Sequence, residues 1–159
     1  MAKPFYSADT YSAQRSIGCL LRRLTNLMLP RAEARFADKD LTFTHWVILM
    51  CLRDGLADTC ADIARHMSYD SGAITRLVDQ LEKRGFVARK RSTTDRRVVH
   101  LAMTAEGKAV TKALTPSTLN FWNELLEDFS AAEAEKLIEL LTRLLNKMEK
   151  TPIAQDEAA

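Results

Sequence analysis

The pattern of apolar and polar residues predicts an amphipathic helix near the middle of the chain. Between residues 70 and 85, apolar side chains recur at the i, i+3, i+4 and i+7 positions of one helical face: Ile74, Leu77, Val78 and Leu81. The opposite face carries short or forked polar side chains: Ser71, Thr75, Arg76, Asp79 and Gln80. Gly85 suits the left-handed conformation that ends many helices. We therefore expect one face of this helix to pack on a core and the other to be exposed.

The same periodicity predicts helices over most of the remaining chain. An apolar stripe begins at Ile17, and its helix is expected to bend or stop near Pro30. Capping residues and apolar spacing predict four further helices, which are 44–53, a short one from Thr59 to about Met67, one after Thr104 with a kink at Pro116, and one that begins at the capping box of Ser130. The last of these has a continuous apolar stripe: Leu137, Leu140, Leu141, Leu144, Leu145 and Met148.

The segment after Gly85 predicts a β-hairpin. Its arms, residues 86–91 and 98–101, contain β-branched residues, and the Ser, Thr and Asp residues of 92–97 have the chemistry of a turn. The expected fold class is therefore mainly α with a small β-hairpin (α+β).

Charge is distributed unevenly, although the formal net charge is only +2. Residues 83–97 contain seven Lys or Arg and one Asp, whereas residues 119–159 contain nine Asp or Glu and four Lys or Arg. A basic run is usually a solvated surface, but this one follows directly on a helix with a polar face. Together they indicate a surface that binds the phosphates and reads the base edges of double-stranded DNA.

Length and composition indicate one domain spanning residues 1–159. At 159 residues and 47% hydrophobic content, the chain is able to bury one core. No window approaches the roughly 18 uninterrupted apolar residues of a membrane span, and the first residues lack the layout of a signal peptide. We therefore expect a cytoplasmic protein with no membrane partner. Cys19, Cys51 and Cys60 fit neither a disulfide framework nor a Cys-x-x-Cys metal site, so we expect reduced, mainly buried thiols.

The apolar stripes of the first and last helices predict a homodimer. Packing within the chain is the alternative, but a central region of about 60 residues leaves little apolar surface to cover both stripes. A dimer in which the termini of two copies interleave is more economical. It would also present two polar helix faces to major-groove sites about 34–36 Å apart on a pseudo-palindrome.

Three motifs resemble the MarR family of winged-helix transcriptional regulators, and the likeness runs from Ile17 to Met148. The motifs are Ser71-Gly-Ala-Ile-Thr-Arg-Leu-Val-Asp-Gln-Leu-Glu-Lys-Arg-Gly85, Asp95-Arg-Arg-Val-Val-His-Leu-Ala-Met-Thr-Ala-Glu-Gly107 and Leu41-Thr-Phe-Thr-His-Trp46, with His45 where the family usually has Gln. The resemblance implies a winged helix-turn-helix at about 40–104 and dimerisation helices at about 1–38 and 116–150. It also implies an obligate dimer that binds palindromic operators and usually represses.

The resemblance assigns DNA-binding roles by position. The recognition helix begins at Asp70 and Ser71, and Thr75 and Arg76 face the major groove, where a guanidinium can bridge guanine O6 and N7. The alternative for Arg76 is a contact with phosphate alone or a pairing with Asp79 or Gln80. In the hairpin, Arg97 matches the family arginine that enters the minor groove, and Asp95 matches the aspartate that orients it. Phosphate or backbone contacts are expected from the remaining candidates: Ser68, Lys90, Arg91, Ser92 and Arg96.

The resemblance further implies a small aromatic or phenolic effector. Candidate lining residues come from the first two helices and offer an aromatic floor with possible partners for an anion: Tyr11, Arg15, His45, Trp46 and Met50. For Trp46 and Met50, helical spacing is more typical of plain core positions.

Three other functions would each require particular residues. Some family members sense peroxide through a cysteine in the first helix, where Cys19 lies, but the neighbouring tyrosines of those sensors are missing. An enzyme is disfavoured because the histidines and cysteines show no metal-ligand or nucleophile spacing and there is no glycine-rich phosphate loop. No catalytic residue, metal or cofactor is therefore predicted. A sequence-neutral architectural DNA-binding protein would share the basic hairpin, and discrimination between operator and random DNA would exclude it.

Overall fold

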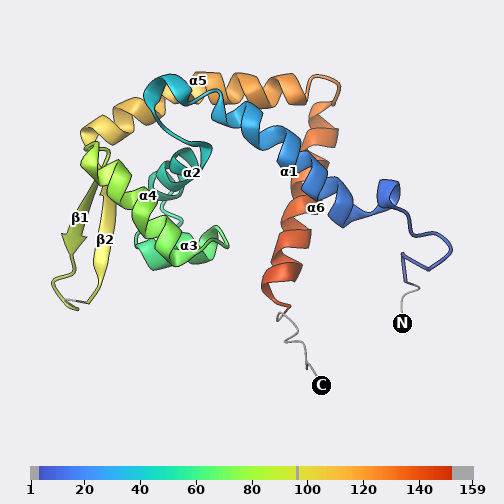
Figure 1. The fold of residues 1–159 in the computed structure, drawn as a ribbon, viewed down its shortest axis with the longest axis horizontal. Coiled ribbons are helices and arrows are strands. Elements are labelled where there is room, and N and C mark those ends of the chain that lie inside the picture. The colour runs from blue at the N-terminus through green and yellow to red at the C-terminus, as the bar shows by residue number, and fades with distance from the viewer. Residues whose placement is uncertain (1–3, 96, 152–159) are drawn as a thin grey trace. The chain divides into compact units, whose positions relative to one another are not determined.

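The computed structural model describes residues 4–95 and 97–151, and within them the fold is mainly helical with one two-stranded hairpin (Figure 1). In chain order the elements are η1 (Ala13–Arg15), α1 (Ile17–Glu33), η2 (Ala37–Lys39), α2 (Phe43–Arg53), α3 (Cys60–His66), α4 (Ser71–Lys83), β1 (Val87–Arg91), β2 (Val99–Met103), α5 (Ala105–Leu125) and α6 (Ala131–Glu149). The predicted α+β fold class with a winged helix-turn-helix is confirmed.

Side-chain caps fix where most of these helices begin. The hydroxyls of Thr42, Thr59 and Ser130 accept hydrogen bonds from backbone N–H groups three residues later, which would otherwise lack a partner. Thr104 does the same for α5, since its Oγ1 accepts from the N–H of Gly107 at 3.0 Å. The starts at Thr59, Thr104 and Ser130 were predicted from the sequence, whereas the helix predicted from about residue 44 begins at Phe43 and its cap Thr42 was not predicted.

The first helix is longer than predicted. We expected it to bend or stop near Pro30, but α1 continues to Glu33. Proline removes only one backbone donor, and the carbonyl of Pro30 still accepts from the N–H of Ala34 at 3.2 Å. The helix therefore gains nearly one more turn beyond the proline.

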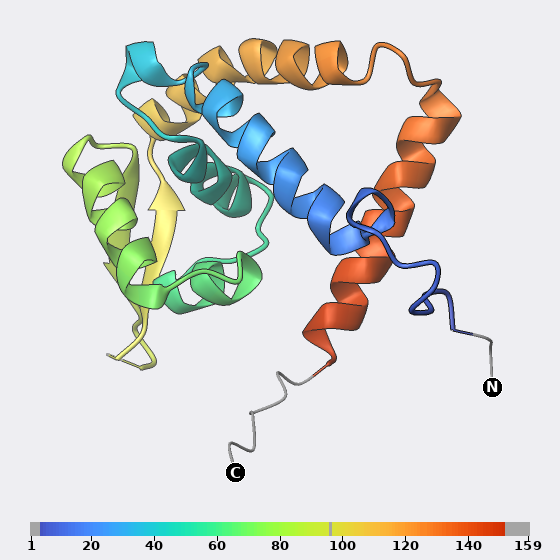
Figure 2. The same ribbon diagram turned by 45° about the vertical axis from the view of Figure 1, so that its right-hand side comes forward.

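The hairpin follows α4 through a tight turn. Gly85 has φ +74°, the left-handed conformation that glycine adopts at low cost. Strands β1 and β2 then pair antiparallel, with Val87 opposite Met103 and Arg91 opposite Val99. The turn that joins them projects beyond α3 and α4 in both ribbon views (Figures 1 and 2).

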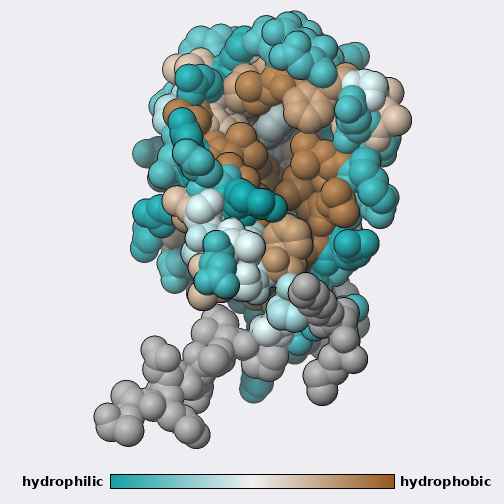
Figure 3. All heavy atoms as spheres, turned by 90° about the vertical axis from the view of Figure 1, so that its right-hand side faces the viewer, coloured by the Kyte–Doolittle hydropathy of each residue, from teal (hydrophilic) through white to brown (hydrophobic). Residues whose placement is uncertain are grey.

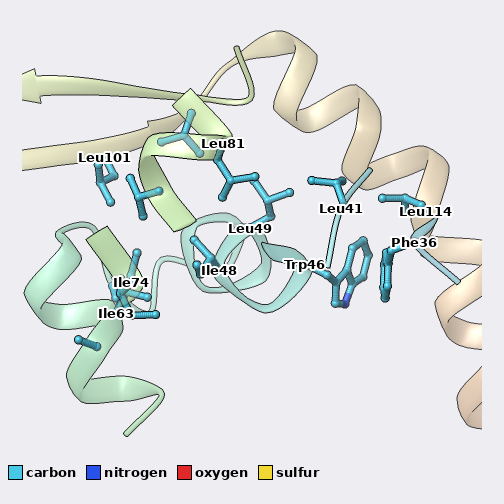
Figure 4. Packing of buried hydrophobic residues seen from close by; sticks show 14 residues of the cluster. Phe36, Leu41, Trp46, Ile48, Leu49, Ile63, Ile74, Leu81, Leu101 and Leu114 are labelled. Atoms are coloured by element: carbon cyan, nitrogen blue, oxygen red, sulfur yellow. The ribbon is translucent and has the colours of Figure 1, made fainter. Parts of the chain in front are cut away.

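One apolar core joins the elements of the winged helix-turn-helix (Figure 4). The rings of Phe36 and Trp46 lie 5.7 Å apart between their centroids, next to Leu41. Farther along, Ile63 of α3 and Ile74 of α4 are fully buried. The predicted inner face of α4 is confirmed, because Ile74, Val78 and Leu81 are its buried residues and Leu77 packs against the same core. This packing orients the opposite face of α4 toward solvent.

The chain divides into two compact units, one up to Thr118 and one from Leu119 onward. The first contains the winged helix-turn-helix, and the second contains the end of α5 and all of α6. Figure 3 shows a group of apolar side chains, coloured brown, that is open to solvent on one face. In α6 the structure buries no residue, although the helix carries the predicted apolar stripe. The boundaries of the dimerisation helices stay predictions.

The three thiols differ in exposure. Cys51 is buried, Cys60 is half-buried and Cys19 is exposed. The expectation of mainly buried thiols is therefore wrong for Cys19, which lies near the exposed start of α1. Burial raises the pKa of the Cys51 thiol, and the neighbouring carboxylate of Asp54 adds to the effect.

No helix within residues 4–95 and 97–151 combines the length and apolar character that crossing a membrane requires.

Candidate nucleic-acid interface

The exposed face of α4 is held in place by a cap at its first turn. Oδ1 of Asp70 accepts a hydrogen bond from the N–H of Ala73 at 2.7 Å, which makes Asp70 the N-cap residue. Ser71, Thr75 and Arg76 are exposed. The Thr75 hydroxyl donates to the carbonyl of Ser71 at 2.8 Å, and its lone pairs stay available to an incoming donor. The structure therefore brings these predicted residues together on one surface.

Arg76 has no ion pair among the residues that the structure describes. A guanidinium has five N–H donors, and the Arg76 side chain is exposed, with its Nη1 near Gly72 in the first turn of α4. A pairing of Arg76 with Asp79 is one of the alternatives that the sequence leaves open. The structure instead places Asp79 2.7 Å from Nη2 of Arg89.

The hairpin presents a second basic surface. Lys90, Arg91 and Arg97 are exposed on it. Oδ1 of Asp95 accepts from the backbone N–H of Arg97 at 2.9 Å, so Asp95 fixes the backbone of the turn rather than the guanidinium. The hydroxyl of Ser92 accepts from the N–H groups of Thr94 and Asp95 in the same turn.

Two predicted DNA-binding residues, Arg96 and Ser68, remain. Arg96 lies outside the described residues. Ser68 is exposed at the end of the turn between α3 and α4, where its φ is +49°. Few residues other than glycine adopt this conformation, and at Ser68 it directs the chain into α4.

Two arginines of the basic run are paired within the protein. The Arg84 guanidinium contacts the carboxylate of Asp40 at 2.6 Å and donates to the backbone carbonyl of Asp40. Arg89 of β1 contacts Asp79 and Glu82 of α4. Burial lowers the pKa of the Arg89 guanidinium, but hydrogen bonds to Asp79, Cys60 and Glu82 outweigh burial and leave the pKa raised. Within the basic run, Arg84 and Arg89 are therefore engaged by carboxylates of the protein itself.

His45 links α2 to the back of α4. It is 2% exposed, and its Nδ1 accepts from the N–H of Thr42 at 3.1 Å to complete the capping box of α2. Burial lowers the pKa of this imidazole, and the nearby Arg84 guanidinium lowers it further, against smaller opposing effects of Gln80 and Asp40. The neutral ring is therefore the form that the fold favours.

A second histidine joins the hairpin to the segment before α3. Nδ1 of His100 lies 2.9 Å from Oδ2 of Asp58, and the N–H of Leu101 donates to the Asp58 carbonyl at 2.6 Å. These contacts fix one edge of β2 to the start of the helix-turn-helix.

The predicted effector residues differ in exposure, and their role in binding stays a prediction. Tyr11 is exposed, and its hydroxyl bonds that of Ser16 at 2.9 Å, while Arg15 ends η1. Trp46 and His45 are buried, and Met50 packs against the core. A cavity of about 460 Å³ lies elsewhere, between the start of α3 and the hairpin, and its lining includes Thr59, Cys60, Asp62, Arg89, Arg97 and Val99.

The internal ion pairs were missed from the sequence. Asp79 and Glu82 are three residues apart and therefore share a helix face, which was a usable signal. Their partner Arg89 comes from a strand that the sequence places only approximately. The partner of Arg84 is 44 residues earlier in the chain, and no local pattern connects them.

Comparison with known proteins identifies the family. Residues 41–99 match the sequence profile of the MarR family. The HTH-type transcriptional regulator SarZ from Staphylococcus aureus (strain USA300) is 30% identical over 108 residues, which are 68% of this chain and 72% of SarZ.

Solved structures have the same fold. A mutant of MarR from E. coli complexed with operator DNA gives a TM-score of 0.74 at 24% identity, over 87% of this chain and 99% of that one. BpsR from Bordetella bronchiseptica, whose DNA binding is regulated by 6-hydroxynicotinic acid, gives 0.74 at 24% identity, over 89% of this chain and 99% of that one. The profile and the SarZ match show that the chain belongs to the MarR family of winged-helix transcriptional regulators.

Proposed function

We propose that this protein is a homodimeric repressor that binds a palindromic operator and is released from it by a small aromatic acid. The observation that carries the proposal is the exposed face of α4, where Arg76 has no internal ion pair among the described residues, next to a hairpin with exposed Lys90, Arg91 and Arg97. A free guanidinium is suited to bidentate contact with guanine. The exposed cations of the hairpin are suited to phosphates and to the minor groove.

The DNA contacts divide into two kinds. In the proposal, Ser71, Thr75 and Arg76 read base edges in the major groove, and Arg97 enters the minor groove. Lys90 and Arg91 contact phosphates and so position the protein without specifying sequence. The operator-bound MarR structure shares this fold, which supports the placement of α4 and the hairpin on DNA.

Two exposed apolar stripes support the homodimer. Leu24 of α1 is 58% exposed and Leu145 of α6 is 54% exposed. The stripe of α1 also contains Ile17, Leu20, Leu21 and Leu27. The stripe of α6 also contains Leu137, Leu140, Leu141, Leu144 and Met148. Apolar patches of this extent are characteristic of interfaces. A second copy of the chain is the occupant that a symmetric DNA site requires.

Sedimentation equilibrium tests the dimer. Leu24→Asp and Leu145→Asp should each convert the dimer to monomer, because each places a charge in the proposed interface. Asn26→Asp adds the same charge to an exposed polar position of α1 and serves as the control. A wild-type protein that sediments as a monomer would contradict the dimer.

The effector proposal is a small aromatic acid. BpsR supports it, because an aromatic acid regulates its DNA binding. In this chain Tyr11 and Arg15 offer an exposed ring and a cation, and a second copy would complete the site around them. His45, Trp46 and Met50 would contact the effector only from the core side, so we base the proposal on Tyr11 and Arg15.

Selection from a randomised DNA pool tests the regulatory function. We expect a palindromic consensus whose affinity falls when salicylate is added, and a smaller salicylate effect in Tyr11→Ala and Arg15→Gln. A consensus that is insensitive to salicylate but lost on peroxide treatment, and protected by Cys19→Ser, would favour the redox alternative, for which the exposure of Cys19 is the supporting observation. Binding without a consensus would favour the architectural one.

A further inference from the structure

Helix α4 carries two carboxylates close to its reading face. Asp79 and Glu82 lie beyond Arg76 on the same helix, and their side chains are 57% and 38% exposed. On a surface that approaches DNA, unpaired carboxylates repel phosphates. Something must neutralise them if the helix is to enter a groove.

Spacing makes Asp79 a competitor for Arg76. The two residues are three positions apart on α4, where oppositely charged side chains meet readily. A guanidinium engaged by Asp79 would have fewer donors left for a guanine. The reading role of Arg76 therefore depends on what Asp79 contacts.

Arg89 contacts both carboxylates. Its Nη2 lies 2.7 Å from Oδ1 of Asp79, and its Nη1 contacts Oε2 of Glu82. Each carboxylate therefore meets one arm of the same guanidinium fork, a geometry that arginine has and lysine lacks. The Arg89 side chain is only 27% exposed, so it is less screened than a fully exposed pair.

The strand register determines the face of the hairpin from which the Arg89 side chain projects. Arg89 is the central residue of β1 and pairs with Leu101, a core residue. It therefore projects from the same face of the hairpin as buried Val87, toward α4, whereas exposed Lys90 belongs to the other face. The hairpin thus supplies the neutralising charge to the helix.

We propose that Arg89 is a positioning residue for sequence recognition, which occupies Asp79 and Glu82 and so leaves the Arg76 guanidinium free to read a base. The inference rests on the proposed reading role of α4. Arg89 itself makes no contact with DNA in this account, although it belongs to the basic run.

A double-mutant cycle tests this role. Operator and scrambled DNA of equal length are titrated at several salt concentrations. Arg89→Gln should lower the preference for operator by roughly tenfold or more, the range of one lost bidentate base contact. Arg89→Gln with Asp79→Asn should restore the preference to within about threefold of wild type, because the carboxylate three residues from Arg76 is then gone, whereas Glu82 is six residues away. The double variant also has the net charge of the wild type.

Lys90→Gln is the matched control. It removes one cation from the adjacent, exposed position of the same strand. It should weaken operator and scrambled DNA equally and reduce the salt slope by about one, and Asp79→Asn should not rescue it.

Three results would overturn the proposal. One is an Arg89→Gln variant with wild-type preference. Another is an Arg89→Gln variant that behaves like Lys90→Gln and is not rescued, which would make Arg89 a phosphate contact. The third is a loss of operator preference in Asp79→Asn alone, which would make Asp79 a base contact. If the wild type shows no operator preference at all, the proposed function fails rather than this inference.

A measurement without DNA covers the case in which Arg89→Gln does not fold. In Asp79→Asn, the side-chain Nε–Hε NMR signal of Arg89 should shift and that of Arg76 should stay unchanged. A shift of the Arg76 signal instead would show that Asp79 pairs with Arg76 in solution, and the proposal would be wrong.

Discussion

Arg84 joins the C-terminal end of α4 to the loop before α2, because its Nη2 lies 2.6 Å from Oδ2 of Asp40 and its Nη1 donates to the Asp40 carbonyl. Asp40 has φ +53°, so the loop turns sharply at the point where the arginine meets it. This contact spans 44 residues of sequence. Together with the Arg89 pairs, it fixes α4 from two sides.

We predict that Arg84→Ala destabilises the fold by about 1 kcal/mol, as expected for a charged donor removed from a backbone carbonyl. Asp40→Asn should cost less, about 0.5 kcal/mol, because the backbone acceptor stays, asparagine tolerates positive φ, and an exposed ion pair contributes little. Urea unfolding of both variants measures the difference. Equal losses would mean that the carboxylate, and not the carbonyl, is the important partner.

The close approach of α5 to the hairpin requires a glycine. A Cβ at Gly107 would collide with the carbonyl oxygen of Phe86 and lie 2.9 Å from its carbonyl carbon. We predict that Gly107→Ala lowers the free energy of unfolding by about 2 kcal/mol or more, because backbone must shift. Gly72→Ala is the control, since its Cβ would meet only side-chain atoms, Oδ1 of Asp70 at 3.3 Å and Nη1 of Arg76 at 3.8 Å, and the higher helix propensity of alanine should offset these contacts. Similar stabilities of the two variants would contradict the packing.

His45 should make stability depend on pH. Its pKa is lowered in the folded protein, first by burial and then by Arg84, so the unfolded chain binds the proton more readily. The stabilisation is therefore complete above the ordinary histidine pKa of about 6.5 and is lost as pH falls below it. The steepest loss for one proton is about 1.4 kcal/mol per pH unit.

Glutamine at this position can also complete a capping box, so His45→Gln is the matched variant. Between pH 7.5 and 5.5, chemical unfolding should show a smaller loss of stability in His45→Gln than in wild type, and His66→Gln, at an exposed position, should behave as wild type. Parallel curves for wild type and His45→Gln would show that the imidazole does not contribute.

The two proposed DNA-reading arginines should give different signatures. Arg97→Ala should weaken binding and reduce the salt slope by about one, because a charged contact is removed. Arg76→Ala should also relax the sequence preference at one base pair per half-site, at a cost of about 1–3 kcal/mol. Titrations with operators substituted one base pair at a time distinguish the two. If neither variant changes operator affinity, the assignment of α4 and the hairpin to DNA is wrong.

Much of the fold was predictable because its signals are local. The inner face of α4 follows from the spacing of Ile74 and Val78, and helix starts follow from capping residues such as Thr59 and Ser130. The end of α1 was not predictable, because proline near a C-terminus removes only one hydrogen bond and packing decides whether the helix continues.

The candidate site was predictable in type and only partly in detail. The polar face of α4 and the basic hairpin are sequence features, whereas the pairing of Arg89 with Asp79 and Glu82 depends on the distance between a strand and a helix. A count of charges does not distinguish Arg84 and Arg89, which pair within the protein, from the exposed cations of the hairpin. His45 has a side chain of the kind that binds small aromatic effectors, but it is buried in the protein as a core residue is.

Sequence-specific DNA binding is measured by the preference of the purified protein for its selected operator over scrambled DNA of equal length at fixed salt. Anisotropy titrations of both DNAs give this ratio. A sequence-specific regulator predicts a ratio of roughly 10³ or more. Equal affinity for the two DNAs would contradict the account and leave only sequence-neutral binding through the basic hairpin.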